Sequence, residues 1–386
     1  MKKLLLACAT VLGASAAMAE TQVDIGFLRV DVPQPAVLSN LDPIPEDEGL
    51  AGATLGLADN NTTGRFLGQT YTLIDQNVPV DGNVIAAAEQ ILAQTDLLVL
   101  DAPAEVLLQI ADLPAAEGAM IFNAAAQDDA LRSDQCRANL FHTIPSHAMR
   151  ADAMMQFFLA RRWDDIVMIA GTHPDDVEWA AALERSAKKF GLKIRARKDW
   201  AFDADMRRNA SQEVPLFTQD FGEYDVVIVA DETDDFARYI AYNTWLPRPI
   251  AGSEGLRPRT WAPVVEQWGA VQLQSRFNDQ SARDMRPRDY AAWAAVRAIG
   301  EAVTRTNQGD ADTLRAFMLS DDFELAGFRG RPLTWRDWNG QLRQTIPLVT
   351  ERAVVANAPL PGFLHQHNEL DTLGIDRPES ACTAFN

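Results

Sequence analysis

Short apolar runs alternate along this chain with longer stretches that are apolar on one side only, a pattern that predicts β-strands separated by α-helices. The stretch from Asn139 to Trp200 shows it most clearly. It predicts, in order, an extended segment, a helix, a buried strand and a second helix at residues 140–143, 146–162, 166–170 and 175–190. Ser146 suits the N-cap of the first helix, and Gly191 suits the end of the second. This stretch is therefore a βα unit of a parallel sheet, entered through a hinge.

The same alternation continues on both sides of this unit. Further strands are predicted at residues 23–30, 71–76, 96–100, 119–123, 225–230, 248–251, 269–277 and 341–351. Further helices are predicted at residues 46–60, 83–94, 104–111, 206–218, 231–242, 287–306 and 311–320, with turns at 60–64. Alternation without hairpin signals indicates doubly wound parallel sheets of the α/β class. The extended connections predict two lobes that close as rigid bodies on a ligand.

The first 19 residues have the features of a secretory signal sequence. Lys2 and Lys3 form the charged start, residues 4–17 are apolar, and Ala-Met-Ala precedes the expected cleavage after Ala19. The apolar part is too short to span a membrane. Cys8 lies in a sequence that resembles a lipoprotein cleavage site, but cleavage there would leave almost no apolar core. We therefore expect a soluble protein exported to the periplasm.

The composition is strongly acidic. The formal net charge is −19, and it becomes −21 when Lys2 and Lys3 leave with the signal sequence. Nucleic acids and anionic membranes require a basic surface, so neither is an expected partner. Cationic ligands are compatible with this charge, but a simpler interpretation is that it keeps an abundant exported protein soluble.

Two cysteines remain after removal of the signal sequence, Cys136 and Cys382. A pair of cysteines in an oxidising compartment favours a disulfide over two free thiols. Such a bond would tie the C-terminal segment to the residues before the first hinge.

Four segments, in the right order, resemble type I periplasmic solute-binding proteins of the branched-chain-amino-acid-receptor class, which serve ABC transporters. They are residues 25–61, 140–191, 251–256 (AGSEGL) and 322–348. The last three resemble the places where the chain of such a receptor crosses between its lobes. The resemblance implies a monomer with three hinge crossings that delivers a small solute to an ABC permease. It places the N-terminal lobe at 20–141 plus 253–328 and the C-terminal lobe with the tail at 142–252 plus 329–386.

The amino-acid sequences of residues 39–69 and 140–146 (LFHTIPS) are similar to those of one subfamily, the receptors encoded with PQQ-dependent alcohol dehydrogenase systems. This resemblance implies uptake linked to periplasmic alcohol oxidation. An alternative is an accessory or sensor protein that binds the dehydrogenase, its cofactor or its metal, calcium or lanthanide.

The same resemblance indicates ligand-binding residues in the N-terminal lobe and at the second crossing. In relatives that bind amino acids, the loops after the third and fourth strands bind the ligand's carboxylate through hydroxyls and backbone N–H groups. Here those loops contain Asp101 and Ala102, and Asn123 and Ala125, without hydroxyls. Glu254 stands where the family has the acid that binds the ligand's amino group. Two acids without a carboxylate clamp favour a cation or a polyol over an α-amino acid.

Polar residues also follow two strands of the C-terminal lobe, at the edge where open α/β sheets bind ligands. Thr172 and His173 follow one strand, and Asp231 and Glu232 follow another. The acidic pair has the alternative interpretation of a helix start, and His173 that of an ordinary loop residue.

Catalytic motifs are absent from the sequence: it contains no GxSxG, HExxH or P-loop pattern, and GLAGATLG lacks the dinucleotide-binding spacing. We therefore expect no enzyme and no cofactor. His365, His367, Glu369 and Asp371 are spaced by two and would share one face of a strand, where they suit a transition metal. Their segment is rich in turn residues instead, so no metal site is assigned.

Overall fold

The structure is a computed structural model that describes residues 20–33, 43–200 and 209–385. The predicted signal sequence with its cleavage site, the first residues of the 39–69 segment and the start of the helix predicted at 206–218 lie outside the described residues.

The first sheet has five parallel strands in the order β2-β1-β3-β4-β5. Their bounds are β1 Thr21–Val30, β2 Gln69–Val78, β3 Leu97–Asp101, β4 Met120–Asn123 and β5 Leu140–His142. Every residue of β3 and β4 is buried. Helices cover both faces of a parallel sheet, so its central strands are apolar throughout rather than alternating.

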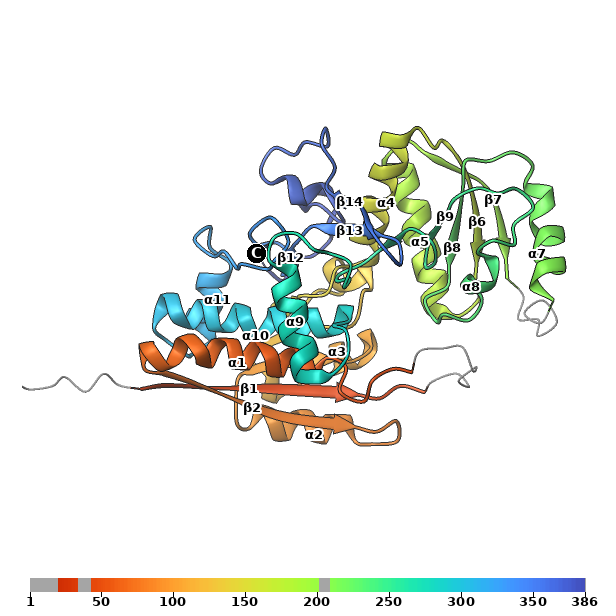
Figure 1. Cartoon of the computed structure of the whole chain (residues 1–386). Helices are drawn as coiled ribbons and strands as arrows, with labels where there is room; N and C mark the ends of the chain where they lie inside the picture. The colour runs from red at the N-terminus through yellow and green to blue at the C-terminus, as the bar shows by residue number, and fades with distance from the viewer. Residues whose placement is uncertain (1–19, 34–42, 201–208, 386) are drawn as a thin grey trace, which may run out of the picture.

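Helices pack on both faces of this sheet. One face carries α1 Leu50–Leu67, α9 Ala270–Ser281, α10 Pro287–Thr306 and α11 Ala311–Met318, and the other carries α2 Val84–Leu92 and α3 Ala104–Ala111. Alternate side chains of β1 enter the two cores, with Ile25 and Phe27 on the α10 side and Leu28 on the α2 side. Figure 1 shows α1, α9 and α10 on one side of β1 and α2 on the other.

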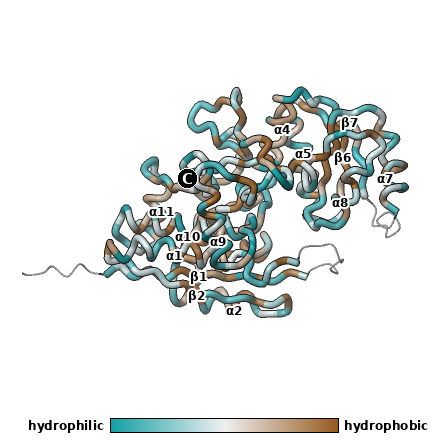
Figure 2. The backbone as a smooth tube through the Cα atoms, viewed as in Figure 1, coloured by the Kyte–Doolittle hydropathy of each residue, from teal (hydrophilic) through white to brown (hydrophobic). Residues whose placement is uncertain are grey.

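The second sheet has the order β7-β6-β8-β9 and forms a separate lobe (Figure 1). Its strands are β6 Asp165–Ala170, β7 Lys193–Asp199, β8 Val226–Ala230 and β9 Ile250–Gly252. One face is covered by α4 His147–Arg161 and α5 Pro174–Lys189, and the other by α7 Ala210–Thr218 and α8 Ala237–Ile240. Figure 2 shows hydrophobic residues gathered along the strands around β6. Among the described residues, no helix has the length and hydrophobicity needed to cross a bilayer.

The chain crosses between the two sheets at places that lie next to one another. These are the passage from β5 to α4, the passage from β9 through β10 Arg257–Pro258 to α9, and the passage from β12 Leu342–Arg343 to β13 Ile346–Val349. Gln341 Nε2 donates to His142 O at 3.0 Å, and β10 pairs antiparallel with β13. The predicted architecture of two α/β lobes joined by hinge crossings is therefore confirmed.

The remaining elements are short. They are β11 Thr334–Trp335, β14 Val354–Ala358 and the 3₁₀ helices Pro114–Ala116, Asp129–Arg132, Gln219–Phe221, Glu369–Thr372 and Arg377–Glu379.

The strand prediction for residues 269–277 is wrong, because this segment belongs to α9. Ala270, Leu273 and Phe277 are its buried residues and recur at the spacing of one helix face. They pack into the core of the first lobe. The three-to-four-residue spacing of these apolar side chains therefore indicates the helix that the strand prediction missed.

The turn prediction for residues 60–64 is also wrong, because α1 continues to Leu67. The Asn60 side chain is buried and donates through Nδ2 to the Val296 carbonyl of α10 at 2.8 Å. Gly68 ends the helix in a left-handed conformation, with φ 68°. Packing against α10 outweighs the turn preference of the local sequence.

Two further elements are shorter than predicted. The helix expected at 231–242 is reduced to α8, because the Asp231 carboxylate accepts the backbone N–H groups of Asp235, Phe236 and Ala237 and holds the chain in a turn. The strand expected at 341–351 is divided into β12 and β13. In the first case hydrogen bonds specific to the folded chain interrupt the helix.

The C-terminal segment contacts both lobes. Cys382 is bonded to Cys136, which confirms the predicted disulfide, and the Phe385 ring lies 5.7 Å from that of Phe141. In the second lobe, Lys189 Nζ of α5 donates to Gly374 O at 2.8 Å. The C-terminal segment therefore connects the lobes independently of the hinge crossings.

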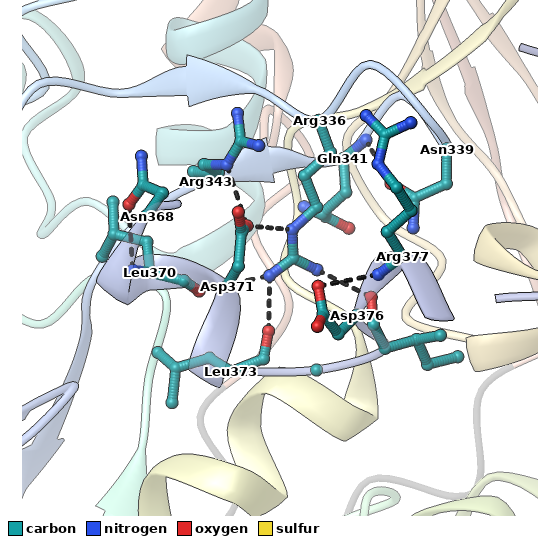
Figure 3. A network of polar contacts seen from close by, with 12 residues as sticks. Arg336, Asn339, Gln341, Arg343, Asn368, Leu370, Asp371, Leu373, Asp376 and Arg377 are labelled. Carbon is teal, nitrogen blue, oxygen red and sulfur yellow. Dashed lines mark hydrogen bonds and ion pairs between the residues drawn. The ribbon is translucent and has the colours of Figure 1, made fainter. Parts of the chain in front are cut away.

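A buried polar network fixes this segment (Figure 3). The Asp371 carboxylate accepts from Arg336 Nε at 2.9 Å and from Arg343 Nε at 2.8 Å. The side chains of Asp371 and Arg336 are each only 1% exposed. Arg336 also donates to the carbonyls of Leu370 and Leu373. A single carboxylate thus faces two guanidinium groups away from water.

Candidate functional site

The candidate site is formed by loops at the carboxyl ends of the strands in both sheets. Asp101 and Asn123 end β3 and β4 of the first sheet. Thr172 and His173 follow β6, Asp231 and Glu232 follow β8, and Glu254 follows β9. All of the predicted residues therefore lie at strand ends or in the loops after them, and their side chains differ in what they bind.

Asp101 is buried, with its side chain 3% exposed, and Arg288 Nη1 of α10 donates to its Oδ1 at 3.1 Å. Its Oδ2 has no hydrogen-bond partner within the described residues. Burial raises the pKa of Asp101, although Arg288 and Arg29 act in the opposite direction. Glu48 lies nearby, and burial raises the pKa of that carboxyl as well. The first lobe therefore presents an unsatisfied carboxylate oxygen, which a hydrogen-bond donor of a ligand would satisfy.

Asn123 and Ala125 are engaged within their own loop. Asn123 Oδ1 accepts the backbone N–H groups of Ala125 and Ala126, at 3.0 and 2.8 Å, and its Nδ2 donates to Ala126 O at 2.7 Å. Ala102, in the neighbouring loop, is buried. These residues shape the two loops of the first lobe.

Thr172 and His173 are exposed at the start of α5. His173 is the N-cap residue of this helix: its Nδ1 accepts from Asp175 N at 3.4 Å, and its own backbone N–H donates to Asp176 Oδ2 at 3.2 Å. The alternative interpretation of His173 as a structural loop residue therefore accounts for its contacts.

The two adjacent acids after β8 have different surroundings. Asp231 faces inward and accepts the backbone N–H groups that lead into α8. Glu232 is bound by Arg150, whose Nη1 and Nη2 lie 2.6 and 3.0 Å from its carboxylate oxygens, and by Ser253 Oγ at 3.1 Å. Burial by itself would raise the pKa of Glu232, but the Arg150 guanidinium lowers it to about 2. Glu232 is therefore ionised in the folded protein.

Arg150 joins the two lobes at the hinge, and the sequence interpretation missed it. Its Nη1 also donates to Gln127 Oε1, in the loop after β4, at 2.8 Å, and its guanidinium lies 4.4 Å from the ring centre of Trp179. A guanidinium in the first turns of α4 thus binds an acid from one sheet and an amide from the other. The available signal was its place one turn after the N-cap Ser146, on a helix entered directly from the hinge.

Glu254 is half-buried, and its Oε1 accepts the N–H of Gly255 at 2.9 Å. Gly252 and Gly255 have φ angles of 107° and 73°, which the turn requires. The Gly-x-Glu-Gly sequence therefore forms the tight turn that leads into β10.

The C-terminal histidines and acids are held by other protein groups. His365 Nε2 lies 3.0 Å from Asp376 Oδ2, Glu369 pairs with Arg331, and Asp371 belongs to the arginine network. In the part of the chain that the structure describes, no three or more His, Cys, Asp or Glu side chains form a group that could hold a metal ion.

Comparison with known proteins identifies the class of fold. No family model matches the chain. No curated protein matches it either. A branched-chain amino acid ABC transporter periplasmic ligand-binding protein from Burkholderia xenovorans LB400 is 14% identical, with 94% of this chain and all 100% of that chain covered and a TM-score of 0.70.

Two further solved structures agree. A periplasmic binding protein from Burkholderia mallei is 15% identical, with 96% of this chain and 100% of that chain covered and a TM-score of 0.66. An ABC transporter solute-binding protein from R. palustris in complex with benzoate is 13% identical, with 94% and 99% covered and a TM-score of 0.62. The chain therefore has the type I periplasmic binding protein fold, as predicted.

Proposed function

We propose that this protein is the periplasmic substrate-binding protein of an ABC uptake system and that its two lobes close on a small solute. The observation that carries the proposal is the position of Arg150. It binds Gln127 from the first lobe and Glu232 from the second, at 2.8 and 2.6 Å, where the chain crosses between them. Polar groups from both lobes therefore meet beside the hinge, so a rigid-body rotation there would change the space between the lobes.

The solute contacts are proposed to come from the loops at the carboxyl ends of the strands. Asp101 supplies a buried carboxylate oxygen without a partner among the described residues, and Thr172 and His173 supply exposed groups on the opposite lobe. Asn123 and Asp231 hold the loops in shape rather than offering free groups. The lobes are proposed to comprise residues 20–141 plus 253–328 and residues 142–252 plus 329–386, although Leu333, Trp335 and Leu342 pack into the core of the first lobe, ahead of the third crossing.

The solved structures with this fold include proteins described as binding leucine or benzoate for ABC transporters. They support uptake of a small solute, without catalysis, as the role of this chain. We further propose an ABC permease as its partner and a monomeric state. The similarity of residues 39–69 and 140–146 to receptors of PQQ-dependent alcohol dehydrogenase systems supports a finer proposal, uptake linked to periplasmic alcohol oxidation.

A screen of melting temperature on the mature protein tests this function. The solutes are alcohols, aldehydes, amino acids, PQQ, Ca²⁺ and lanthanides, since a ligand that binds only the folded state raises the melting temperature. We expect one class to raise it and Asp101→Asn to reduce that shift. Asp321→Asn, an exposed acid after α11, is the matched control and keeps the full shift.

Two outcomes would contradict the proposal. One is a screen in which no solute class changes the melting temperature. The other is stable co-purification with the dehydrogenase without any solute, which would favour the accessory role.

A further inference from the structure

Two arginines extend from the strand that forms the second crossing. Arg257 lies in β10, and the Arg259 backbone N–H continues the pairing of that strand by donating to Pro347 O at 3.0 Å. Side chains at positions i and i+2 of a strand share one face. Arg257 and Arg259 are both half-buried, whereas Pro258 between them is buried. The two guanidinium groups are therefore on the same side of the hinge strand.

These arginines lie beside the site around Arg150. Arg150 Nε donates to the Pro258 carbonyl at 3.4 Å, so β10 contacts the arginine of the Arg150–Glu232 ion pair. Glu232 lowers the cost of burying Arg259, as an acid close to a guanidinium does. The hinge strand therefore adds two cationic groups to the same polar region where the lobes meet.

The nearby carboxylates are already bound elsewhere. Glu232 is paired with Arg150 through two contacts of 2.6 and 3.0 Å. Asp234 is paired with Arg238 at 2.8 Å, and the Glu254 carboxylate accepts the backbone N–H of Gly255. These three acids thus have their own partners, and among the described residues no carboxylate is hydrogen-bonded to the side chain of Arg257 or Arg259.

Two observations show that the two hinge arginines, Arg257 and Arg259, are incompletely compensated by protein groups. Arg257 Nε is buried without a hydrogen-bond partner among the residues that the structure describes. Burial lowers the pKa of Arg259 to about 10, and Arg257 and Arg150 add to this effect more than Glu232 and Asp234 oppose it. A guanidinium group in such surroundings is stabilised by an oxyanion, which its planar donors bind in pairs.

We propose that Arg257 and Arg259 form an anion subsite at the hinge, where the lobes meet, and that the solute carries a carboxylate or a phosphate group. This proposal rests on the proposed solute-binding function and changes the ligand chemistry that the sequence predicts. The sequence interpretation found acids at Asp101 and Glu254 and no carboxylate clamp, because the arginines lie outside the family's ligand-binding loops. The solute would then meet arginine donors at the hinge and, in the first lobe, the Asp101 oxygen that has no partner among the described residues.

Matched pairs of anionic and neutral compounds test the subsite on the mature protein. The pairs are benzoate with benzyl alcohol, acetate with ethanol, and glycerol phosphate with glycerol, and inorganic phosphate is added alone. We expect at least one anion to raise the melting temperature while its neutral counterpart leaves it unchanged. The carboxylates and the phosphates separate the two sources of the oxyanion.

Variants connect the effect to the two arginines. Arg257→Gln and Arg259→Gln each weaken the apparent Kd of the active anion about tenfold or more, since hydrogen bonds to a charged group are lost. Arg248→Gln is the control, because Arg248 is exposed and pairs with Glu223 on the surface. Equal binding of a neutral counterpart, or unchanged affinity in both variants, overturns the proposal.

A measurement without any solute gives an independent check. Arg259→Gln removes a guanidinium that lacks a full counter-charge, so we expect the melting temperature of the ligand-free protein to rise. Arg150→Gln breaks a paired guanidinium and lowers it. A lower melting temperature for Arg259→Gln contradicts the subsite.

The solute screen separates failure of the subsite from failure of the proposed function. If a neutral or cationic solute binds and requires Asp101, solute binding stands and only the subsite is refuted. If no solute of any class binds, the proposed function itself fails.

Discussion

Asp371→Asn is expected to destabilise the C-terminal segment strongly. The Asp371 carboxylate is 1% exposed and accepts hydrogen bonds from Arg336 and Arg343 (Figure 3). Asparagine has nearly the same shape but no charge, so the substitution leaves the space filled and removes the counter-charge of two guanidinium groups. Burial already lowers the pKa of Arg336, and Asp371 acts against this effect. In the variant, the free-energy cost of burying the Arg336 guanidinium is therefore no longer offset by the Asp371 carboxylate.

The size of the destabilisation depends on the contacts that Arg336 and Arg343 keep in the variant. Removing one partner of a buried ion pair costs about 3–5 kcal/mol. Arg336 keeps its carbonyl acceptors, Leu373 O at 2.6 Å, Leu370 O at 3.2 Å and Ile375 O at 3.3 Å. Arg343 is 14% exposed and retains contact with water. We therefore expect a loss near the lower limit, about 3 kcal/mol.

Chemical denaturation of the mature protein measures this loss, and hydrogen exchange locates it. The Gly374 N–H donates to Asp152 Oδ2 at 2.7 Å and is a buried reporter of the segment. Its exchange should accelerate in Asp371→Asn while amides of the first sheet are unchanged. Asp337→Asn is the control: Asp337 pairs with Arg377 at the surface and is 50% exposed, so its loss costs about 0–1 kcal/mol.

A double variant tests the cause. Arg336→Met in the Asp371→Asn background removes the unpaired guanidinium and should restore part of the lost stability, as replacement of a buried ion pair by apolar groups often does. The reasoning is refuted if Asp371→Asn is no more destabilising than Asp337→Asn. It is also refuted if the double variant is less stable than Asp371→Asn alone.

Three further predictions concern the covalent link, the hinge and the packing of helices. Loss of the bond between Cys136 and Cys382, by serine substitution of both, should cost about 2–5 kcal/mol in denaturation, because it closes a long loop. Since the folded pKa of Glu232 is about 2 against an ordinary 4.5, its stabilisation is complete above about pH 4.5 and is lost as the pH falls towards 2. Glu232→Gln should therefore flatten the denaturation profile between pH 6 and 3, by about 2 kcal/mol, and an unchanged profile would contradict this. Gly52→Ala should cost about 1–3 kcal/mol, because its Cβ would lie 1.9 Å from Asp289 O of α10, and alanine at an exposed position of α1 should be neutral.

Much of the fold was predictable because its signals are local. The apolar run 166–170 is a strand, Ser146 caps α4 through a hydrogen bond from Met149 N, and Pro287–Thr306 is a helix as predicted. Each of these depends on residues within a few positions of one another. The turn prediction at 60–64 failed because Asn60 is held by α10, which lies 236 residues further along the chain.

The candidate site was predictable only in part. The sequence placed Asp101, Glu232 and Glu254 at the ends of strands, because parallel strands align their carboxyl ends at one edge. It did not show that Glu232 is bound by Arg150, 82 residues away, or that one Asp101 oxygen is without a partner among the described residues.

The sequence by itself determined the alternation of strands and helices, the helix ends and the pairing of the two cysteines, since hydrophobic period, capping and cysteine number are properties of the chain. Only the tertiary structure decided which polar side chains meet: Arg150 with Glu232 and Gln127, Asp371 with Arg336 and Arg343, and Arg259 with Arg150 at the hinge. The physical reason is that an ion pair depends on distance and burial in the folded chain, and separation along the sequence specifies neither.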